Sequence, residues 1–176
     1  MNNKSEIISF EKVSFKQFQK DMNEEFPIFS QLELQEMYDN ILLPTRATAK
    51  SSGHDFAMPF DVNLGVGKSI KIPTGIKVNM DSFLTMLIFP RSGLGFKYYV
   101  RLANTIGVGD GDFYNNKNTE GHYFVKIRNE GDFPISLKSG DYFCQGVITT
   151  YFISENDIPR TETRIGGLGS SDNSGK

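Results

Sequence analysis

The chain has 176 residues, of which 19 are lysine or arginine and 21 are aspartate or glutamate, and its formal charge is −2. This length predicts one domain that is large enough to bury a core. The mildly negative charge argues against a general nucleic-acid-binding protein, which needs a basic surface. With 17 glycines and no tryptophan, the turn-rich sequence is more typical of a β-protein than of a helical bundle.

Cysteine content and hydropathy indicate where such a chain is found. The single cysteine, Cys144, excludes an internal disulfide and favours a reducing compartment. No stretch resembles a signal peptide, and the apolar run at residues 84–89 is too short to cross a bilayer. We therefore expect a soluble, cytoplasmic protein that contacts neither a membrane nor nucleic acid directly.

The sequence of residues 1–42 predicts a short helical addition, with two amphipathic helices after a strand at residues 7–10. Residues 14–17 and 30–33 both carry a capping-box pattern, which marks a helix start, and Pro44 ends the second helix. The apolar residues recur at helical spacing: Phe15, Phe18 and Met22, then Leu34, Met37, Tyr38 and Ile41. Two interpretations stay open, an accessory layer packed on the domain or a docking surface for another protein.

Residues 43–153 predict a domain of many short strands, and residues 154–176 predict a mobile, polar and glycine-rich arm. The expected strands cover residues 70–72, 76–78, 85–89, 98–102, 122–128 and 144–152. The run at residues 85–89 is continuously apolar, which indicates a strand buried on both faces. Short strands at this spacing predict a jelly roll or barrel.

Two blocks in the middle of the chain carry candidate chemistry. Residues 90–97 (PRSGLGFK) offer a cation, a hydroxyl and glycines that let backbone N–H groups approach an anion. Residues 104–114 (NTIGVGDGDFY) offer an amide that reads a polar ring edge, a carboxylate and an aromatic face. The first block thus offers groups that bind phosphates, and the second offers groups that bind a base together with an acid. Together they indicate a nucleotide site.

In this order the two blocks resemble motifs two and three of the trimeric dUTP pyrophosphatases (dUTPases), in particular phage or Gram-positive-like members. Residues 52–56 (SGHDF) are similar to the first motif, residues 140–145 (GDYFCQ) to the fourth, and residues 164–171 (RIGGLGSS) to the fifth, a mobile C-terminal arm. Five motifs in the family's order are stronger evidence than one glycine-rich block. The resemblance implies a distorted jelly-roll β-barrel and hydrolysis of dUTP to dUMP and pyrophosphate, which keeps uracil out of DNA.

The resemblance implies catalytic roles for Asp110 and Gln145. Asp110 would hold the water that attacks the α-phosphorus, because a carboxylate orients water and accepts its proton. Gln145 would contact the α-phosphate region and the water. Taken alone, Asp110 resembles an ordinary turn aspartate, but Asn104 and Phe113 stand beside it at the family's spacing.

The resemblance also implies a substrate-binding set. Asn104 would read the uracil edge, since an amide both donates and accepts, and Phe113 would pack on the deoxyribose where the family usually has tyrosine. Tyr114 is a possible substitute for that tyrosine, and Gly109 replaces a common aliphatic residue, which predicts a looser hairpin. The set is Arg91, Ser92, Gly93, Asn104, Gly107, Asp112, Phe113, Arg164, Gly166, Gly167, Leu168, Gly169 and Ser170.

The arm and the metal complete the expected site. Arg164 would close over the γ-phosphate, and Leu168 would cover the base without the stacking that the family's usual phenylalanine provides. No histidine or cysteine cluster has zinc-site spacing, so the expected cofactor is Mg²⁺ held mainly by the three phosphates and waters. Asp55 would contact this metal through water or serve as a structural turn residue, and Ser52 and His54 depart from the first motif.

The resemblance further implies a homotrimer with shared sites, in which one subunit provides the uracil hairpin, a second the phosphate block and a third the arm. A regulatory protein that binds a repressor is an alternative, for which residues 115–118 or the N-terminal helices could serve. A dCTP deaminase is the other alternative, but Lys126 stands where that activity needs a glutamate base. The retained Asp110, Ser92 and Gln145 argue against an inactive relative.

Overall fold

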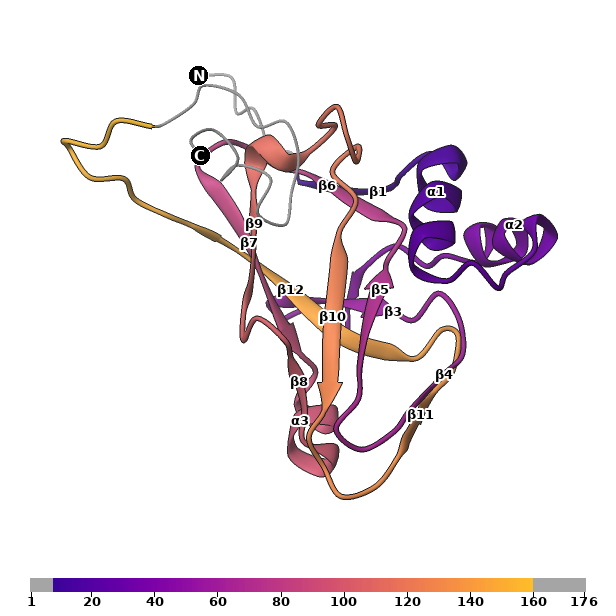
Figure 1. The fold of residues 1–176 in the computed structure, drawn as a ribbon. Helices are drawn as coiled ribbons and strands as arrows, with labels where there is room; N and C mark the ends of the chain where they lie inside the picture. Colours follow the sequence, from indigo (N-terminus) through magenta and orange to yellow (C-terminus); the bar gives the residue numbers. More distant parts are fainter. Residues whose placement is uncertain (1–7, 160–176) are drawn as a thin grey trace, which may run out of the picture.

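The computed structural model of the protein describes residues 8–159, which form a mainly β fold (Figure 1). The helices are α1 (Phe15–Glu25), α2 (Gln31–Asp39) and α3 (Ser92–Tyr98), with a 3-10 turn η1 (Gly111–Phe113). The strands are β1 (Ser9–Lys12), β2 (Thr45–Arg46), β3 (Gly53–Ala57), β4 (Val62–Leu64), β5 (Ser69–Pro73), β6 (Ile76–Asn79), β7 (Leu84–Pro90), β8 (Val100–Leu102), β9 (Gly107–Asp110), β10 (Phe124–Asn129), β11 (Ile135–Leu137) and β12 (Tyr142–Thr150). The predicted fold class is therefore confirmed.

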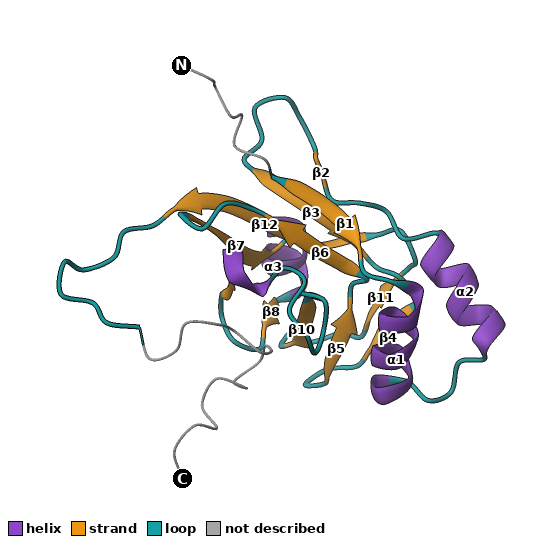
Figure 2. Cartoon of the chain, turned by 90° about the horizontal axis from the view of Figure 1, so that it is seen from above, coloured by secondary structure: helices purple, strands orange, loops and turns teal. Residues whose placement is uncertain are grey.

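Hydrogen bonding groups these strands into four antiparallel sheets. The largest has the order β2-β3-β12-β7-β9, and a three-stranded sheet has the order β5-β10-β8. Figure 2 shows these two sheets in separate layers, while β1 pairs with β6 and β4 with β11. The layers agree with the predicted distorted jelly roll, although hydrogen bonding within residues 8–159 does not close them into one continuous barrel.

The facing sides of the two layers form the core. Phe56, Met86, Ile127 and Phe143 come from four different strands and are at most 1% exposed. Full burial of each such side chain contributes about 1.5–3 kcal/mol. Strand β7 is buried along most of its length, as its continuous apolar run predicts. Because β7 lies inside the largest sheet, it fixes the positions of the strands on both of its sides.

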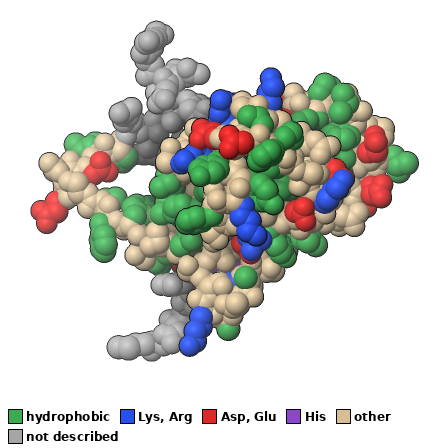
Figure 3. Space-filling model, turned by 90° about the horizontal axis from the view of Figure 1, so that it is seen from below, with side chains coloured by type: hydrophobic (Ala, Val, Ile, Leu, Met, Phe, Trp, Pro, Cys, Tyr) green, Lys and Arg blue, Asp and Glu red, His purple; other side chains and the backbone are tan. Residues whose placement is uncertain are grey.

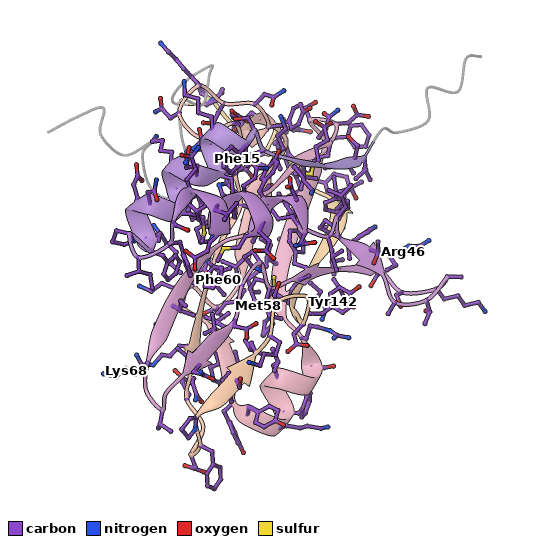
Figure 4. The ribbon with its side chains drawn as sticks, turned by 90° about the vertical axis from the view of Figure 1, so that its right-hand side faces the viewer. Phe15, Arg46, Met58, Phe60, Lys68 and Tyr142 are labelled. Atoms are coloured by element: carbon purple, nitrogen blue, oxygen red, sulfur yellow. The ribbon has the colours of Figure 1, made fainter. Side chains whose placement is uncertain are left out.

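The N-terminal helices cover one end of the two layers (Figure 2) and share their core. Phe18 of α1 and Leu34 of α2 are at most 1% exposed and belong to the same apolar cluster as the strands. Phe26 packs on Phe60, with ring centroids 4.9 Å apart, and Figure 4 shows Phe60 below the helices. This packing supports the interpretation of an accessory layer. The domain boundary after residue 42 stays a prediction, since the core is continuous across it.

Both predicted helix starts are confirmed by their hydrogen bonds. The Ser14 hydroxyl accepts from the Gln17 backbone N–H at 3.1 Å. In α2 the Ser30 hydroxyl accepts from the Glu33 N–H at 3.3 Å, while the Glu33 carboxylate accepts from the Ser30 N–H at 2.7 Å. These bonds satisfy N–H groups that a helix start leaves unpaired. Within residues 8–159 no helix is both long and apolar enough to cross a membrane.

The structure differs from the sequence prediction mainly at the motif blocks. Residues 92–98 form α3, although two glycines lower their helix propensity and a strand was expected from residue 98. Tyr99 ends this helix in the left-handed conformation, with φ 52°, so β8 begins only at Val100. Residues 53–57 form β3 despite the polar His54 and Asp55, because pairing with β12 supplies the hydrogen bonds.

Candidate active site

The phosphate block lies where β3, β7 and β12 meet. Asp55 of β3 stands opposite Gln145 of β12, and the Arg91 Nε atom lies 3.3 Å from the Asp55 Oδ1 atom. Asp55 is buried and Arg91 is half-buried, so the ion pair fixes the guanidinium at the N-terminal end of α3. The Tyr142 ring, labelled in Figure 4, lies 5.5 Å from the guanidinium carbon. The geometry is compatible with the anion-binding role expected of Arg91, and the ion pair with Asp55 also braces the site.

Gln145 is held beside this ion pair. Its side-chain amide donates to the Pro90 carbonyl at 3.4 Å. A β-carbon at position 53 would overlap the Gln145 amide oxygen, so a glycine at position 53 leaves room for that side chain. Ser92 is exposed at the start of α3, and Arg91 and Ser92 line one pocket of about 490 Å³. The Arg91 cation and the Ser92 hydroxyl thus line a pocket where an anion could bind, and the Gln145 amide contacts Pro90, the residue before Arg91.

Two neighbouring groups add no charge to this cluster. Burial lowers the pKa of His54, so the imidazole beside Asp55 is neutral at neutral pH. Burial, together with the nearby Asp55 carboxylate, raises the pKa of the Cys144 thiol well above its usual range. Cys144 therefore lies next to Gln145 as a neutral core residue, without the thiolate that nucleophilic chemistry needs.

Residues 103–113, which follow β8 and include β9 and η1, carry the second group of candidate residues. We call them the hairpin segment, although β8 and β9 pair with different strands and lie in different sheets. Asn104 lies in the turn of this segment, and Gly107 begins β9, where a β-carbon would approach the Ile88 side chain to 3.1 Å. Asn104 and Gly107 line a pocket of about 270 Å³ together with Lys71 and Lys126. Lys126, which stands in the sequence where the deaminase pattern needs its glutamate, thus lines the same pocket as Asn104. An ammonium there cannot act as a general base at neutral pH, which argues against deamination.

Asp110 lies at the opposite end of β9 from Gly107. It pairs with Thr85 of β7, whose hydroxyl donates to the Gly109 carbonyl at 3.1 Å. Asp110 and Asp112 line a further pocket of about 490 Å³ with Ser82. Strand pairing therefore fixes the backbone of the candidate water-binding carboxylate.

The residues around Phe113 correct one expectation. A β-carbon at Gly109 would overlap the Tyr123 ring and hydroxyl, so Tyr123 fills the space that a larger residue would take. The hairpin is packed there rather than loosened. The Phe113 ring meets the Tyr123 ring edge-on, with centroids 5.2 Å apart. The Tyr114 hydroxyl donates to Glu11, and the role of Tyr114 as a substitute for the family's tyrosine stays a prediction.

One chain does not bring the two groups onto a single phosphate. Asp110 pairs with Thr85 on one side of β7, whereas Gln145 pairs with Phe89 on the other side. Four residues along a strand correspond to roughly 13 Å, and the two flanking strands lie about 10 Å apart. The structure thus groups Asp55, Arg91, Ser92 and Gln145, and separately Asn104, Gly107, Asp110, Asp112 and Phe113.

Some expected residues lie outside the described part of the chain. These are the arm residues Arg164, Gly166, Gly167, Leu168, Gly169 and Ser170. The sequence analysis missed Lys71 and Tyr151, which line the hairpin pockets. Neither residue belongs to a motif. Lys71 lies in β5 and Tyr151 follows the end of β12, so only the folding of the chain brings them to these pockets.

Carboxylate, hydroxyl and amide groups of this kind suit the attack of water on a phosphate, which places the protein among the nucleotide hydrolases. The sequence model of the dUTPase family matches residues 39–172. The deoxyuridine 5′-triphosphate nucleotidohydrolase of Lactococcus lactis is 34% identical over 132 residues, which are 74% of this chain and 88% of the relative. That of Haemophilus ducreyi is 35% identical over 136 residues, 73% of this chain and 86% of the relative. The chain belongs to the dUTPase family.

Solved structures agree with this assignment. The crystal structure of the dUTPase from Streptococcus mutans has a TM-score of 0.64 and 28% identity, and the match covers 84% of this chain and 99% of that one. A dUTPase from phage phi11 of S. aureus has a TM-score of 0.61 and covers 88% of this chain and 97% of that one. At 15% identity this second likeness shows the fold alone.

Proposed function

We propose that the chain hydrolyses dUTP to dUMP and pyrophosphate. The observation that carries this proposal is the arrangement of the hairpin, with Asn104 and Gly107 at a pocket by one end of β9 and Asp110 at the other end. Three residues of strand correspond to roughly 10 Å, a span suited to a nucleoside with its first phosphate. A panel of nucleoside triphosphates tests it, with dUTP releasing pyrophosphate and dCTP, dTTP and UTP serving as poor substrates.

Each residue has a distinct task in the proposed reaction. Asn104 pairs with the uracil edge, and Phe113 packs on the deoxyribose so that a 2′-hydroxyl does not fit. Asp110 orients a water molecule and takes its proton as the oxygen attacks the α-phosphorus. Arg91, Ser92 and Gln145 hold the phosphate chain through hydrogen bonds whose strength rises as charge develops.

A Mg²⁺ ion fits this site when it is bound mainly by the phosphates of the substrate. Within residues 8–159 no group of three or more histidine, cysteine, aspartate or glutamate side chains forms a metal cage. Asp55 is already paired with Arg91, so it would reach the ion through water. When bound to the three phosphates, Mg²⁺ would neutralise their charge and favour in-line attack.

We further propose a homotrimer in which each site combines residues of different subunits. The separation of Asp110 from Gln145 along β7 supports this, because one copy cannot supply both to one phosphate. Residues 151–159 project away from the body of the fold (Figure 1). Two apolar side chains in this segment are left exposed, Phe152 by 96% and Ile158 by 86%. Apolar side chains also lie across the face in Figure 3. Such exposure is typical of a surface that another subunit covers.

The arm would complete the site. Its motif, residues 164–171, follows the projecting segment closely enough in sequence to reach a neighbouring subunit. Arg164 and the glycine N–H groups would bind the γ-phosphate, and Leu168 would cover the uracil without stacking on it. Closure of the arm would exclude water from the phosphates.

A protein partner of the repressor type is a second candidate function. Ile28, between α1 and α2, and Leu32 of α2 are 81% and 79% exposed, and the acidic residues Glu24, Glu25 and Glu33 stand near them in the sequence. Residues 115–118 are a weaker candidate, since Asn116 is buried and bonded within its own turn. Removing residues 1–42 would take Phe18 and Leu34 out of the shared core and damage the fold. A pull-down that compares the native chain with an Ile28→Glu, Leu32→Glu variant is therefore the cleaner test.

A further inference from the structure

We propose that the N-terminal segment positions the sugar-binding end of the site by holding residues 114–122, the connection that follows Asp110 and Phe113. The proposal rests on the proposed function for its consequence, but its contacts are independent of it. The dUTPase family model begins at residue 39. Three residues before that point, Glu11, Ser14 and Asp21, bond to this connection.

The first contact lies directly after Phe113. The Tyr114 hydroxyl lies 2.9 Å from both carboxylate oxygens of Glu11, to which it donates. Burial, followed by the hydrogen bond to Glu11 and the Glu11 charge, raises the pKa of Tyr114, so the hydroxyl keeps its proton. Lys77 pairs with Glu11 in the β1–β6 ladder, and its ammonium lies 5.2 Å from the Tyr114 ring centroid and donates to Asn115 at 2.7 Å. Tyr114 is thus held on two sides.

The second contact lies near the end of the connection. The Ser14 hydroxyl donates to one oxygen of Glu120 at 2.6 Å, and the Ser14 backbone N–H donates to the other at 2.8 Å. Burial opposes ionisation of Glu120, but the hydrogen bonds from Ser14 outweigh it and lower the Glu120 pKa. Because Ser14 also caps α1, the start of this helix and the connection share one anchor.

The third contact is a buried chain of hydrogen bonds. His122 is fully buried and Asp21 is 3% exposed, and the His122 Nδ1 atom lies 2.6 Å from the Asp21 Oδ2 atom. The Gly75 N–H donates to the His122 Nε2 atom at 2.7 Å, which leaves the Nδ1 atom to donate to Asp21. Gln17 donates to the same carboxylate oxygen at 2.8 Å. Helix α1 therefore holds the residue before Tyr123.

These contacts fix both neighbours of the Phe113 ring. Tyr114 follows Phe113 in sequence, and Tyr123, next to His122, packs edge-on against it. Phe113 has no polar group with which to fix its own ring. Its position against a sugar therefore depends on the two ends of the connection, and both ends are fastened to the N-terminal segment.

The test compares variants that remove one contact without removing a buried side chain. Tyr114→Phe deletes only the hydroxyl, and Glu120→Gln replaces one of the two oxygens that accept from Ser14 by an amide nitrogen, which cannot accept. Glu11→Gln keeps an oxygen that accepts from the Tyr114 hydroxyl, so it serves as the conservative variant that should retain this contact. Asp61→Asn is the matched control, because Asp61 accepts from Lys138 at 2.7 Å and from the Ser139 N–H at 2.9 Å, away from these contacts.

Two readouts separate positioning from simple stability. Amide hydrogen exchange of residues 113–122 should be faster by about tenfold in Tyr114→Phe and Glu120→Gln, the effect of losing one hydrogen bond to a charged group. The preference for dUTP over UTP, taken as a ratio of kcat/KM values, should fall several-fold, mainly through KM. Glu11→Gln and Asp61→Asn should stay near the native values, and all four should melt within a few degrees of the native chain.

The outcomes distinguish this proposal from the proposed function. If the native chain releases no pyrophosphate from dUTP, the proposed function is wrong. The hydrogen-exchange data then still test whether the N-terminal contacts hold residues 114–122. If Tyr114→Phe and Glu120→Gln match Asp61→Asn in both exchange and substrate preference, the N-terminal segment does not position the site and the proposal is overturned.

Discussion

Gly109 lies against Tyr123 so closely that a β-carbon at position 109 would overlap the tyrosine hydroxyl and ring. Gly109 belongs to β9 and Tyr123 is the residue before β10, so their contact joins β9 to the opposite layer. Because Phe113 packs on the same ring, the fit at Gly109 also affects where Phe113, the proposed sugar-binding residue, lies.

We predict that Gly109→Val destabilises the fold by about 1–3 kcal/mol, since an overpacked core must shift its neighbours. Urea unfolding measures this change. Gly65→Ala is the matched control, because its added carbon would meet only the Lys68 side chain at an ordinary 3.6 Å. Equal stability of Gly109→Val and the native chain would show that Tyr123 moves aside freely.

Asp21→Ala should cost about 1–3 kcal/mol of unfolding free energy, because it leaves a buried His122 N–H without its acceptor. Asp39→Ala, which removes an exposed helix carboxylate that accepts from Gln35, should stay within about 0.5 kcal/mol of the native value. Chemical denaturation of both variants provides the comparison. A loss no larger than that of Asp39→Ala would mean that α1 is not held by this pair.

The Ser14–Glu120 contact should make stability depend on pH. The folded-state pKa of Glu120 is lowered, despite burial, from its ordinary value of 4.5. The stabilisation is therefore fully present above about pH 4.5 and disappears as the pH falls through the folded-state pKa. Glu120→Gln should be less stable than the native chain at pH 7, and the difference should shrink in acid. A difference that is constant with pH would contradict this assignment.

The sequence predicted those features whose signal is local. The capping residues Ser14 and Ser30, the buried strand β7 and the mainly β class follow from hydrogen-bonding chemistry, apolar runs and turn residues. Helix α3 was missed because its glycines disfavour a helix, and its formation depends on tertiary packing. The Tyr114–Glu11 bond was also missed, since it joins residues 103 positions apart without a motif. The roles of the site residues stay predictions until variants are measured.

Shared sites predict that two inactive variants restore each other. Asp110→Asn and Gln145→Ala should each be nearly inactive alone. Refolded together in equal amounts, they should regain about a quarter of native activity, because a site needs Asp110 from one kind of subunit and Gln145 from the other. Light scattering should show trimers in every sample. No recovery in confirmed mixed trimers would place both residues in a site made by one subunit.

The arm should contribute to catalysis and little to stability. A chain ending at residue 159 should melt like the native chain but lose on the order of 2–4 kcal/mol of transition-state stabilisation, a slowing by a factor of tens or more. Arg164→Ala should reproduce much of the defect, and Leu168→Phe should lower KM by adding a ring that stacks on uracil. Full activity of the shortened chain would remove the arm from the mechanism.

The most direct test of the account is pyrophosphate release from dUTP by Asp110→Asn beside the native chain, with Mg²⁺ present. The amide still hydrogen-bonds water but cannot take its proton, so the variant should bind a non-hydrolysable dUTP analogue normally. Its turnover should fall by about 10²–10⁴-fold, the usual contribution of a general base. Near-native turnover in Asp110→Asn would contradict the assignment of Asp110 and with it the proposed mechanism.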